Sequence, residues 1–526
     1  MSVSLPLLTR VSQDDVTFLL TPRARPVKVP NPAPATLPAP LQARMPDRTP
    51  GPGEQYRFHF DMSVCIGCKC CVVACNEQNG NPAELNWRRV GEIEGGWYPT
   101  TQRAYFSMGC NHCLDPTCLK GCPVDAYSKD PLTGIVRHSA DTCIGCQYCT
   151  WNCSYGVPQF NPERGVVGKC DMCHGRLERG QSPACVSACP EGAIRIEIVN
   201  VADWRASVEA FAAGSEGLPS ADASLSTTRV TMPEKLPPGA RPLDLTHVKP
   251  DHPHWPLVVM TVLTQMSVGA FAAIWLEQVA SAVGETGLRF AALASLIVAN
   301  LALGASTLHL GRPAHAYRAL KMWKRSWLSR EVLLFSIFAA VAQLYAAVLW
   351  FGIRGAEAAG ALTVVSGLAG VTATAYIYRV ASRPAWNSVL TLLQFMTTAA
   401  LLGPAFAAAI GAGDPRVLRF AVAGAASLQA LLIAVGFLRL IASDQIELRG
   451  TARLLSTVLA PQFIVRGLLL LIAGVALPLA SPSGTSLAIA AVLLLAGEIL
   501  GRYLFFVSVV PKHMTTPYLS MGSEAA

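Results

Sequence analysis

Seventeen cysteines, all between residues 65 and 189, constrain this 526-residue chain more than any other feature. They fall into four groups. At least 20 residues separate the first group from the second, and the second from the third. The groups are Cys65, Cys68, Cys70, Cys71 and Cys75; Cys110, Cys113, Cys118 and Cys122; Cys143, Cys146, Cys149 and Cys153; and Cys170, Cys173, Cys185 and Cys189. A pattern this dense predicts a domain that folds around metal centres.

Two groups have the C-x2-C-x2-C-x3-C spacing typical of [4Fe–4S] ferredoxins, and two are stretched versions of it. Three thiolates on a tight turn can bind one cluster, whereas the fourth lies a helical turn further on and binds a different one. The groups therefore work in pairs, and the sequence predicts four [4Fe–4S] clusters with sixteen ligands. Cys70 has no place in this spacing, and we interpret it as a buried free thiol.

Two other uses of cysteine are less compatible with the pattern. Structural zinc sites also use C-x2-C pairs, but they need neither a third nearby cysteine nor the C-x3-C-Pro ending seen at Cys122 and Cys189. Disulfides suit small secreted domains, and no signal peptide precedes this one.

Composition changes sharply near residue 255. The chain has only 14% charged residues and a mean hydropathy of +0.37, which is too apolar for an ordinary soluble protein. The sequence before residue 255 is polar or cysteine-rich, and long apolar runs dominate after it. The net charge of +8 is spread over both parts, and no basic run with interleaved aromatics suggests nucleic-acid binding.

These features predict five segments. Residues 1–55 are a Pro/Ala-rich disordered extension, 56–200 a four-cluster domain, 201–255 a linker that partly wraps this domain, 256–512 a membrane anchor, and 513–526 a tail. Short strands are expected at 56–60, 134–138 and 193–199. The predicted fold class is an α+β tandem ferredoxin-like [4Fe–4S] domain followed by an all-α bundle of eight transmembrane helices.

Eight apolar stretches of about 20 residues can each span a bilayer. They are 257–280, 288–309, 331–352, 359–379, 388–410, 417–438, 463–481 and 486–510. Basic residues are more numerous in the loops after spans two, four and six than in the opposite loops. By the positive-inside rule, the cluster domain faces the cytoplasm, and the protein is a multi-pass protein of the bacterial inner membrane.

The cysteine region resembles the four-cluster iron–sulfur subunit of the dimethyl sulfoxide reductase family of molybdenum enzymes. The matching segments are at 65–71, 109–113, 121–126, 143–149 and 169–173. In that family the first and fourth groups exchange their last cysteines, as do the second and third. The resemblance therefore implies four ligand sets: Cys65, Cys68, Cys71 with Cys189; Cys170, Cys173, Cys185 with Cys75; Cys110, Cys113, Cys118 with Cys153; and Cys143, Cys146, Cys149 with Cys122.

Two ionisable residues stand at the membrane boundary. His309 closes the second expected span and Glu331 opens the third, and such residues are functional-site candidates. A histidine can bind a quinone oxygen and take its proton, and a carboxylate can pass the proton on. The alternative is structural: His309 caps a helix and Glu331 pairs with Arg330 or Arg312. His309 is the only histidine within an expected span, so the paired ligands of a haem b are missing and we expect no haem.

This second region is similar to the membrane-anchor subunit of the same family, in which this histidine and glutamate belong to the quinol site. The resemblance implies a quinone site at His309 and Glu331, with Arg312 as a further candidate. The Glu498–Arg502 segment also fits the family, and we expect these two side chains to pair inside the bundle. The two subunits are usually separate chains, and here they are fused.

The sequence thus predicts a non-catalytic electron-transfer and membrane-anchor subunit. It would connect membrane quinone with a separate molybdopterin-containing catalytic subunit through four [4Fe–4S] clusters. The direction stays open between a dimethyl sulfoxide reductase-like, quinol-oxidising complex and a sulfite dehydrogenase-like, quinone-reducing one. The alternative is a membrane-anchored polyferredoxin that serves soluble donors and has no quinone site.

Overall fold

A computed structural model describes residues 44–99, 101–212, 224–234, 239–242, 248–280, 285–481 and 483–512. Residues 1–43 of the expected extension and the tail at 513–526 lie outside this part of the chain. Residues 44–55 are described, and they already contact the cluster domain: the carbonyl of Arg44 accepts a 2.9 Å hydrogen bond from the amide of Ile196.

The cysteine-rich part is built on four small sheets. Strand β1 (Glu54–Asp61) lies between β8 (Ile194–Asn200), which is antiparallel to it, and β9 (Arg229–Thr231), which is parallel. Strand β2 (Arg89–Gly95) lies between β3 (Gln102–Met108) and β10 (Arg241–Pro242). Two hairpins follow, β4 (Tyr127–Lys129) with β5 (Val136–His138), and β6 (Gln159–Asn161) with β7 (Val166–Gly168). The three expected strands are confirmed as β1, β5 and β8.

The alternation of apolar and polar residues in β1 places its large side chains in the core. Phe58 and Phe60 are buried, and they stand opposite the buried Ile196 and Ile194 of β8. Five short helices adjoin the cysteine turns: α3 (Cys70–Asn79), α4 (Thr117–Gly121), α5 (Tyr148–Asn152), α6 (His174–Leu177) and α7 (Ala184–Ser187).

The segment interpreted as a linker contains more regular structure than expected. It forms α8 (Val201–Ala212), β9 and β10, and both strands extend sheets of the cluster domain. Between α8 and β9, the hydroxyl of Thr227 donates a 2.6 Å hydrogen bond to the carbonyl of Asn111, and the carbonyl of Leu225 accepts one of 2.8 Å from the amide of Leu114. These contacts tie the segment to the second cysteine group.

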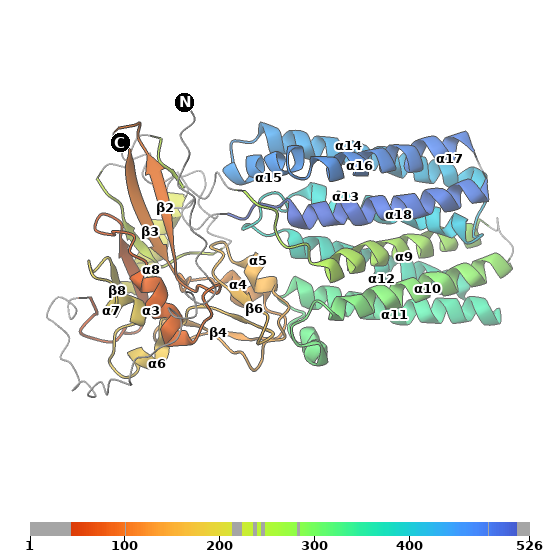
Figure 1. Ribbon diagram of the computed structural model, residues 1–526. Coiled ribbons are helices and arrows are strands. Elements are labelled where there is room, and N and C mark those ends of the chain that lie inside the picture. The colour runs from red at the N-terminus through yellow and green to blue at the C-terminus, as the bar shows by residue number, and fades with distance from the viewer. Residues whose placement is uncertain are drawn as a thin grey trace, which may run out of the picture. The chain divides into compact units, whose positions relative to one another are not determined.

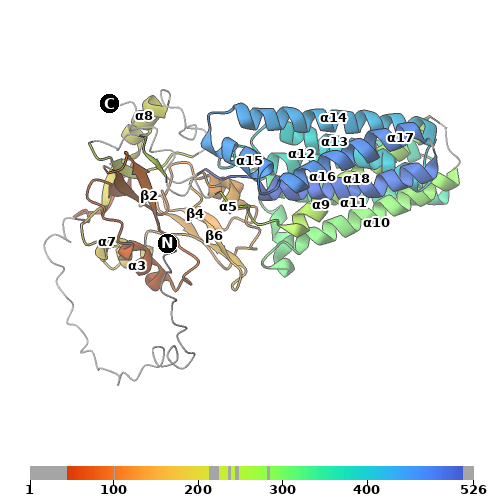
Figure 2. The same cartoon turned by 45° about the horizontal axis from the view of Figure 1, so that its top comes forward.

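The second part is helical, and its long helices run side by side (Figures 1 and 2). They are α9 (Trp255–Val279), α10 (Glu285–Thr307), α11 (Trp327–Phe351), α12 (Ala356–Tyr378), α13 (Val389–Ala409), α14 (Pro415–Ala442), α16 (Ala460–Leu471), which continues through a π-turn at Ile472–Ala476 into α17 (Leu477–Ala480), and α18 (Gly484–Val507). Helix α9 is the central one, since it contacts α10, α12, α13 and α18. A 3₁₀ helix (Pro313–Leu320) precedes α11, and the amphipathic α15 (Ile446–Ser456) follows α14.

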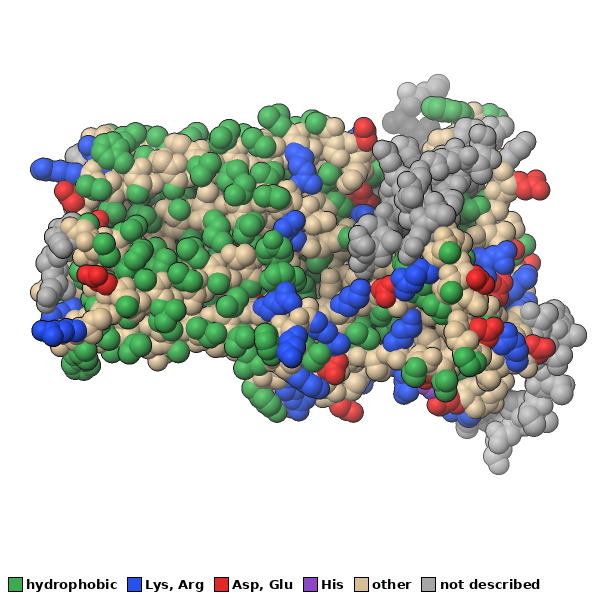
Figure 3. Space-filling model, turned by 180° about the vertical axis from the view of Figure 1, so that it is seen from behind, with side chains coloured by type: hydrophobic (Ala, Val, Ile, Leu, Met, Phe, Trp, Pro, Cys, Tyr) green, Lys and Arg blue, Asp and Glu red, His purple; other side chains and the backbone are tan. Residues whose placement is uncertain are grey.

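Eight helices among the described residues are long and apolar enough to cross a membrane. This confirms the number of spans, and each lies within a few residues of the expected stretch. On the face shown in Figure 3, hydrophobic side chains cover the long helices, whereas Lys and Arg lie toward their two ends, with more of them next to the cysteine-rich part. An apolar surface of this kind is suited to contact with the lipid chains of a bilayer.

Candidate functional site

The sixteen thiols influence one another's pKa values mainly within four sets. Burial raises the pKa of Cys118 well above its ordinary value, and the neighbouring thiols of Cys153, Cys110 and Cys113 raise it further. Burial likewise raises the pKa of Cys149, with Cys146, Cys122 and Cys143 as its thiol neighbours. The thiols that add to the raised pKa of Cys65 are Cys71, Cys189 and Cys68, and those that add to that of Cys75 are Cys170, Cys185 and Cys173. Each of these sets contains one cysteine from a different group; that the sets bind four clusters stays a prediction.

Local backbone geometry explains how the groups supply these sets. The C-x2-C turns contain residues in the left-handed region, such as Gly67 with φ 71° and Gly145 with φ 69°, which close the turn tightly. A short helix then begins, and the last cysteine of the group lies one turn further on: Cys75 within α3, Cys122 after α4 and Cys153 after α5. The last thiol therefore leaves its own turn and joins the opposite set.

The donor chemistry of these sets fits iron–sulfur clusters. All four donors in each set are thiols, none of the seventeen cysteines forms a disulfide, and cysteine thiolates are the usual ligands of such clusters. Among the described residues no three His, Cys, Asp or Glu side chains converge closely enough to hold a single metal ion. When bound, the clusters supply one-electron carriers.

Two buried cations beside the thiols were not anticipated from the sequence. Burial opposes the charge of Arg88, but the thiols of Cys185, Cys71, Cys170 and Cys75 raise its pKa above the ordinary value. Lys169 is also buried; its ammonium donates a 2.8 Å hydrogen bond to the carbonyl of Cys170. No spacing rule identifies either residue, because each comes from outside the cysteine turns or between them.

The prediction for Cys70 is wrong. This thiol is exposed, because Cys70 is the first residue of α3 and the helix turns it away from the core that receives Cys71 and Cys75.

In the membrane part, His309 and Glu331 line one cavity of about 260 Å³. Cys146, Tyr148 and Trp151 of the cluster domain line the same cavity, together with apolar residues of α9, α10, α11 and α12. The cavity therefore lies where the helices meet the third cysteine group. It offers an apolar enclosure with two ionisable side chains, as ligand sites commonly do.

His309 does not end a helix as expected, because α10 stops at Thr307 and His309 lies in the turn that follows. Its ring is hydrogen-bonded to the backbone of Cys146, and burial lowers its pKa to about 4. The Nε2 atom has no hydrogen-bond partner among the described residues. The ring stacks on Trp151, with centroids 6.2 Å apart.

His254 is a further residue of this site that the sequence did not reveal. Its ring centroid lies 5.3 Å from that of His309 and 5.3 Å from that of the exposed His252. The three imidazoles thus lead from the cavity to the surface. The short His-Pro-His sequence was the available signal, but nothing in it indicates that His254 meets a residue 55 positions away.

Glu331 is buried, and its Oε1 accepts a 2.6 Å hydrogen bond from the hydroxyl of Thr374. Glu331 does not pair with Arg330, which was the structural alternative. Arg330 donates to the carbonyls of Trp323 and Lys324 instead. Arg312 is not among the residues that line the cavity. Its guanidinium donates a 2.8 Å hydrogen bond to the carbonyl of Ala140 in the cluster domain.

Three glycines make the contact beside the cavity. The amide of Gly311 donates to the carbonyl of Gly145, at 3.3 Å, and a Cβ on Gly311 would clash with the carbonyl of Gly165. The two backbones can therefore approach only without side chains. This fixes the turn that carries His309 against the loop of Cys143 and Cys146.

Much of the basic loop between α10 and α11 binds the cluster domain. Arg325 forms a 2.5 Å ion pair with Asp125, to which Lys321 also approaches, at 3.6 Å. Arg318 donates to the carbonyl of Asp141, at 3.1 Å. These residues were counted as a topology signal, and the structure gives them a docking role as well.

The expected pairing of Glu498 with Arg502 is wrong. Arg502 donates a 2.8 Å hydrogen bond to Oε1 of Gln265, and Oε2 of Glu498 accepts one of 2.7 Å from Thr398. Neighbouring helices supply closer partners than the i, i+4 position does.

Comparison with known proteins also divides the chain into a cysteine-rich part and a helical part. Residues 101–198 match the family described as 4Fe–4S dicluster domain, and residues 249–507 match the DMSO reductase anchor subunit (DmsC). A chain of the anaerobic dimethyl sulfoxide reductase of Haemophilus influenzae is 42% identical over 146 residues, which cover 26% of this protein and 71% of the relative. The chain of the same name in Escherichia coli strain K12 is 42% identical over 144 residues, 26% of this protein and 70% of the relative. A subunit of the sulfite dehydrogenase of Allochromatium vinosum is 36% identical over 160 residues, which cover 26% of this protein and 67% of the relative.

The fold and the thiol sets define an iron–sulfur electron-transfer protein joined to a multi-pass membrane anchor. The protein belongs to the dimethyl sulfoxide reductase family, as a fusion of its iron–sulfur subunit and its anchor subunit. Membership implies association with a molybdoenzyme catalytic partner.

Proposed function

We propose that the protein carries electrons between a membrane quinone bound in the His309–Glu331 cavity and a separate molybdopterin-containing catalytic subunit, by way of four [4Fe–4S] clusters. The observation that carries the proposal is that His309, Glu331 and Cys146 line one cavity. A redox ligand in that cavity would be in contact with Cys146, a proposed cluster ligand. Electron transfer over such a short separation needs no further carrier.

We assign the cluster ligands to the four sets described above. They are Cys65, Cys68, Cys71 and Cys189; Cys170, Cys173, Cys185 and Cys75; Cys110, Cys113, Cys118 and Cys153; and Cys143, Cys146, Cys149 and Cys122. The mutual proximity of the four thiols in each set supports this assignment. Arg88 and Lys169 balance part of the negative charge of these sets.

The side chains of the cavity have distinct roles in this proposal. Nε2 of His309, which is buried and has no partner among the described residues, binds a quinone oxygen and exchanges a proton with it. Glu331, which also lines the cavity and is held in place by Thr374, handles a second proton. Apolar residues such as Leu303 and Phe335 enclose the ring and exclude water. Arg312 stabilises the contact between the domains and does not bind the quinone.

We further propose that the anchor lies in the bacterial inner membrane with the cluster domain in the cytoplasm. The excess of basic residues on the cluster side supports this orientation. Two directions remain candidates, since the relatives include proteins of a dimethyl sulfoxide reductase and of a sulfite dehydrogenase. The first corresponds to oxidation of quinol, and the second to reduction of quinone.

A quinone analogue added to the purified complex tests the proposal. It should change the electron paramagnetic resonance (EPR) signal of the cluster bound by Cys146, because the cavity contacts that ligand. In a His309→Ala variant, the same analogue should leave this EPR signal unchanged. An unaltered spectrum in the unsubstituted protein would favour the alternative, a membrane-anchored polyferredoxin that serves soluble donors.

A further inference from the structure

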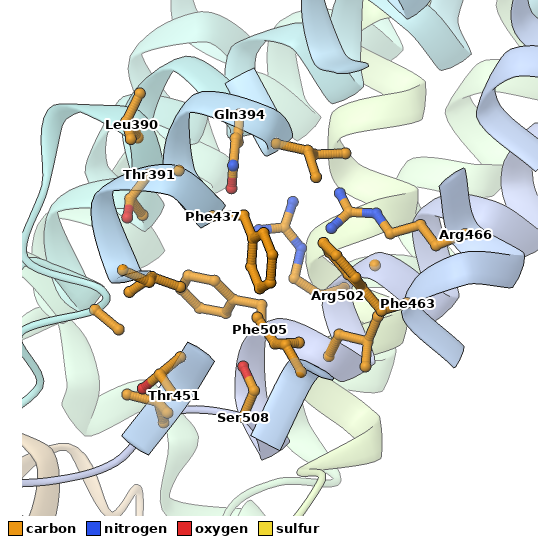
Figure 4. Close-up of a pocket in the computed structure, with 18 of the residues that line it drawn as sticks. Leu390, Thr391, Gln394, Phe437, Thr451, Phe463, Arg466, Arg502, Phe505 and Ser508 are labelled. Atoms are coloured by element: carbon orange, nitrogen blue, oxygen red, sulfur yellow. The ribbon is translucent and has the colours of Figure 1, made fainter. Parts of the chain in front are cut away.

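A second cavity, of about 120 Å³, lies among α13, α14, α16 and α18. It shares no lining residue with the His309 cavity. Three arginines line it, Arg439, Arg466 and Arg502, but only one carboxylate, that of Glu498. Figure 4 shows the guanidinium groups of Arg466 and Arg502 directed toward each other at its centre. Like charges converge in this way only where something compensates them.

Of the two central arginines, Arg502 is buried and Arg466 is partly buried. The side chain of Arg466 is 12% exposed, and Arg502 is 5% exposed. Arg502 uses one nitrogen to donate to Gln265 and lies over the ring of Phe395, 3.6 Å from its centroid. Nε of each arginine has no hydrogen-bond partner among the residues that the structure describes. A guanidinium has five N–H donors, so both groups can still bind an anion.

Glu498 does not balance this charge. Its Oε2 accepts hydrogen bonds from Thr398 at 2.7 Å and from Gln429 at 3.4 Å. Its Oε1 lies 4.0 Å from the guanidinium of Arg466, at the limit of an ion pair. One engaged carboxylate faces one buried and one partly buried cation, and an uncompensated buried charge is strongly unfavourable.

The backbone is adapted to the Arg466 side chain. Gly501 precedes Arg502, and a Cβ at Gly501 would clash with Nε and Cζ of Arg466. The glycine therefore allows the guanidinium of Arg466 to lie against α18.

We propose that this cavity binds a phosphoryl anion, supplied by the headgroup of an anionic phospholipid or by free phosphate. Arginine pairs bind phosphate oxygens with paired N–H donors. A volume of about 120 Å³ can hold a phosphoryl group but not a whole lipid, whose chains would remain outside.

The position of the cavity suits a lipid headgroup. Arg439 is three residues from the end of α14, Ser508 follows the end of α18, and Thr451 lies in α15. Basic pockets between transmembrane helices at this depth bind anionic headgroups. The partly exposed Leu390, Ile433 and Phe437 line the cavity's apolar side.

This end of the bundle adjoins the cluster domain. The amide of Val510 donates to the hydroxyl of Thr451, and the amide of Lys512 donates to the carbonyl of Ser382. The hydroxyl of Ser382 in turn donates to the carbonyl of Trp151 in α5. The anion would therefore bind at the membrane boundary, where headgroups lie.

The full-length protein, purified with its clusters and stripped of lipid, is the material for the test. Its thermal stability is measured in vesicles of phosphatidylcholine, in vesicles that also contain phosphatidylglycerol, and in phosphatidylcholine with inorganic phosphate. We expect a rise in the unfolding temperature with one of the two anions, and the arm that gives it identifies the source.

Arg466→Gln and Arg502→Gln should each weaken the responsible anion's apparent affinity at least about tenfold, since each removes a charged hydrogen bond. Arg466→Lys keeps the charge but lacks the paired donors, so it should weaken the apparent affinity for the anion less than Arg466→Gln does. This graded effect distinguishes a lost anion contact from a variant that merely fails to fold. Arg416→Gln, at the other end of α14, is the control and should leave it unchanged. No response to either anion in the unsubstituted protein, or an equal response in all variants, would overturn the proposal.

Discussion

The imidazole of His309 stacks on the indole of Trp151, with ring centroids 6.2 Å apart and an interplanar angle of 26°. Trp151 lies in α5, between Cys149 and Cys153, which belong to two different thiol sets. His309 lies in the turn after a membrane helix. The contact therefore joins the membrane cavity to the second and third cysteine groups.

The first prediction concerns Gly311. A Gly311→Ala substitution introduces a Cβ that clashes with the carbonyl of Gly165, so the turn that carries His309 must shift. A displacement of about 1 Å can cost roughly 10²-fold in rate, and we expect a loss of this order in quinone-linked turnover, with iron content unchanged. Gly304→Ala on α10, where a Cβ meets nothing within 4 Å, is the control. Equal rates for both variants would contradict the proposed role of the contact.

Glu331 gives the second prediction. Glu331→Gln keeps the size of the side chain and can still accept the hydrogen bond from Thr374, but it cannot carry a proton. We expect quinone-linked turnover to fall about 10²-fold or more, while electron exchange between the clusters and soluble dyes is unaffected. Glu357→Gln, at the exposed start of α12, serves as control. A normal rate for Glu331→Gln would assign the proton to another group.

His254 gives a prediction about pH. Burial, followed by the effect of His309, lowers the pKa of His254 to about 4, whereas the unfolded chain has a value near 6.5. As the pH falls from 6.5 toward 4, the unfolded state binds the proton first, so the protein loses stability over this range. The full difference corresponds to at most about 3 kcal/mol.

Thermal unfolding of the complex between pH 7 and pH 4.5 measures this effect. His254→Phe should flatten the profile, because phenylalanine keeps the ring contacts with Trp151 and Phe506 without a titrating group. An unchanged slope in the variant would show that other groups cause the pH dependence.

Arg88 gives a prediction about potentials. The guanidinium lies among Cys185, Cys71, Cys170 and Cys75, and a positive charge stabilises the reduced, more negative state of a nearby cluster. Arg88→Met should lower the reduction potentials of the two clusters bound by these thiols, by an amount on the order of tens of millivolts. Arg103→Met in β3, where the arginine is exposed, should leave them unchanged. Redox titration followed by EPR distinguishes the two variants.

The sequence predicted two kinds of feature: those carried by a repeated cysteine spacing and those that a bilayer requires. The spacing of the cysteines predicts that the last thiol of a group joins a different set, because a tight turn and one helical turn determine where each thiol points. Which groups exchange thiols was implied only by the family resemblance. The eight spans were predictable because a bilayer requires about 20 apolar residues for each helix. His309 and Glu331 stood out because ionisable residues are rare near such spans.

Apart from Cys70, the errors and omissions arise where contacts between distant segments decide the outcome. Cys70 was expected to be buried, but its place at the start of α3 exposes it. Arg502 was expected to pair with Glu498, but Gln265 on α9 is its hydrogen-bond partner. His254 reaches His309 only because the start of α9 packs beside the turn after α10. Periodicity within one segment carries no information about such partners.

The most direct test is the reduction of the clusters by quinol in a single turnover, followed by EPR in the purified complex. In the unsubstituted protein, added quinol should reduce the cluster assigned to Cys143, Cys146, Cys149 and Cys122. In His309→Ala, that reduction should be slowed about 10²-fold or more, while dithionite still reduces all clusters. Equal rates of reduction by quinol in both proteins would contradict a quinone site at His309.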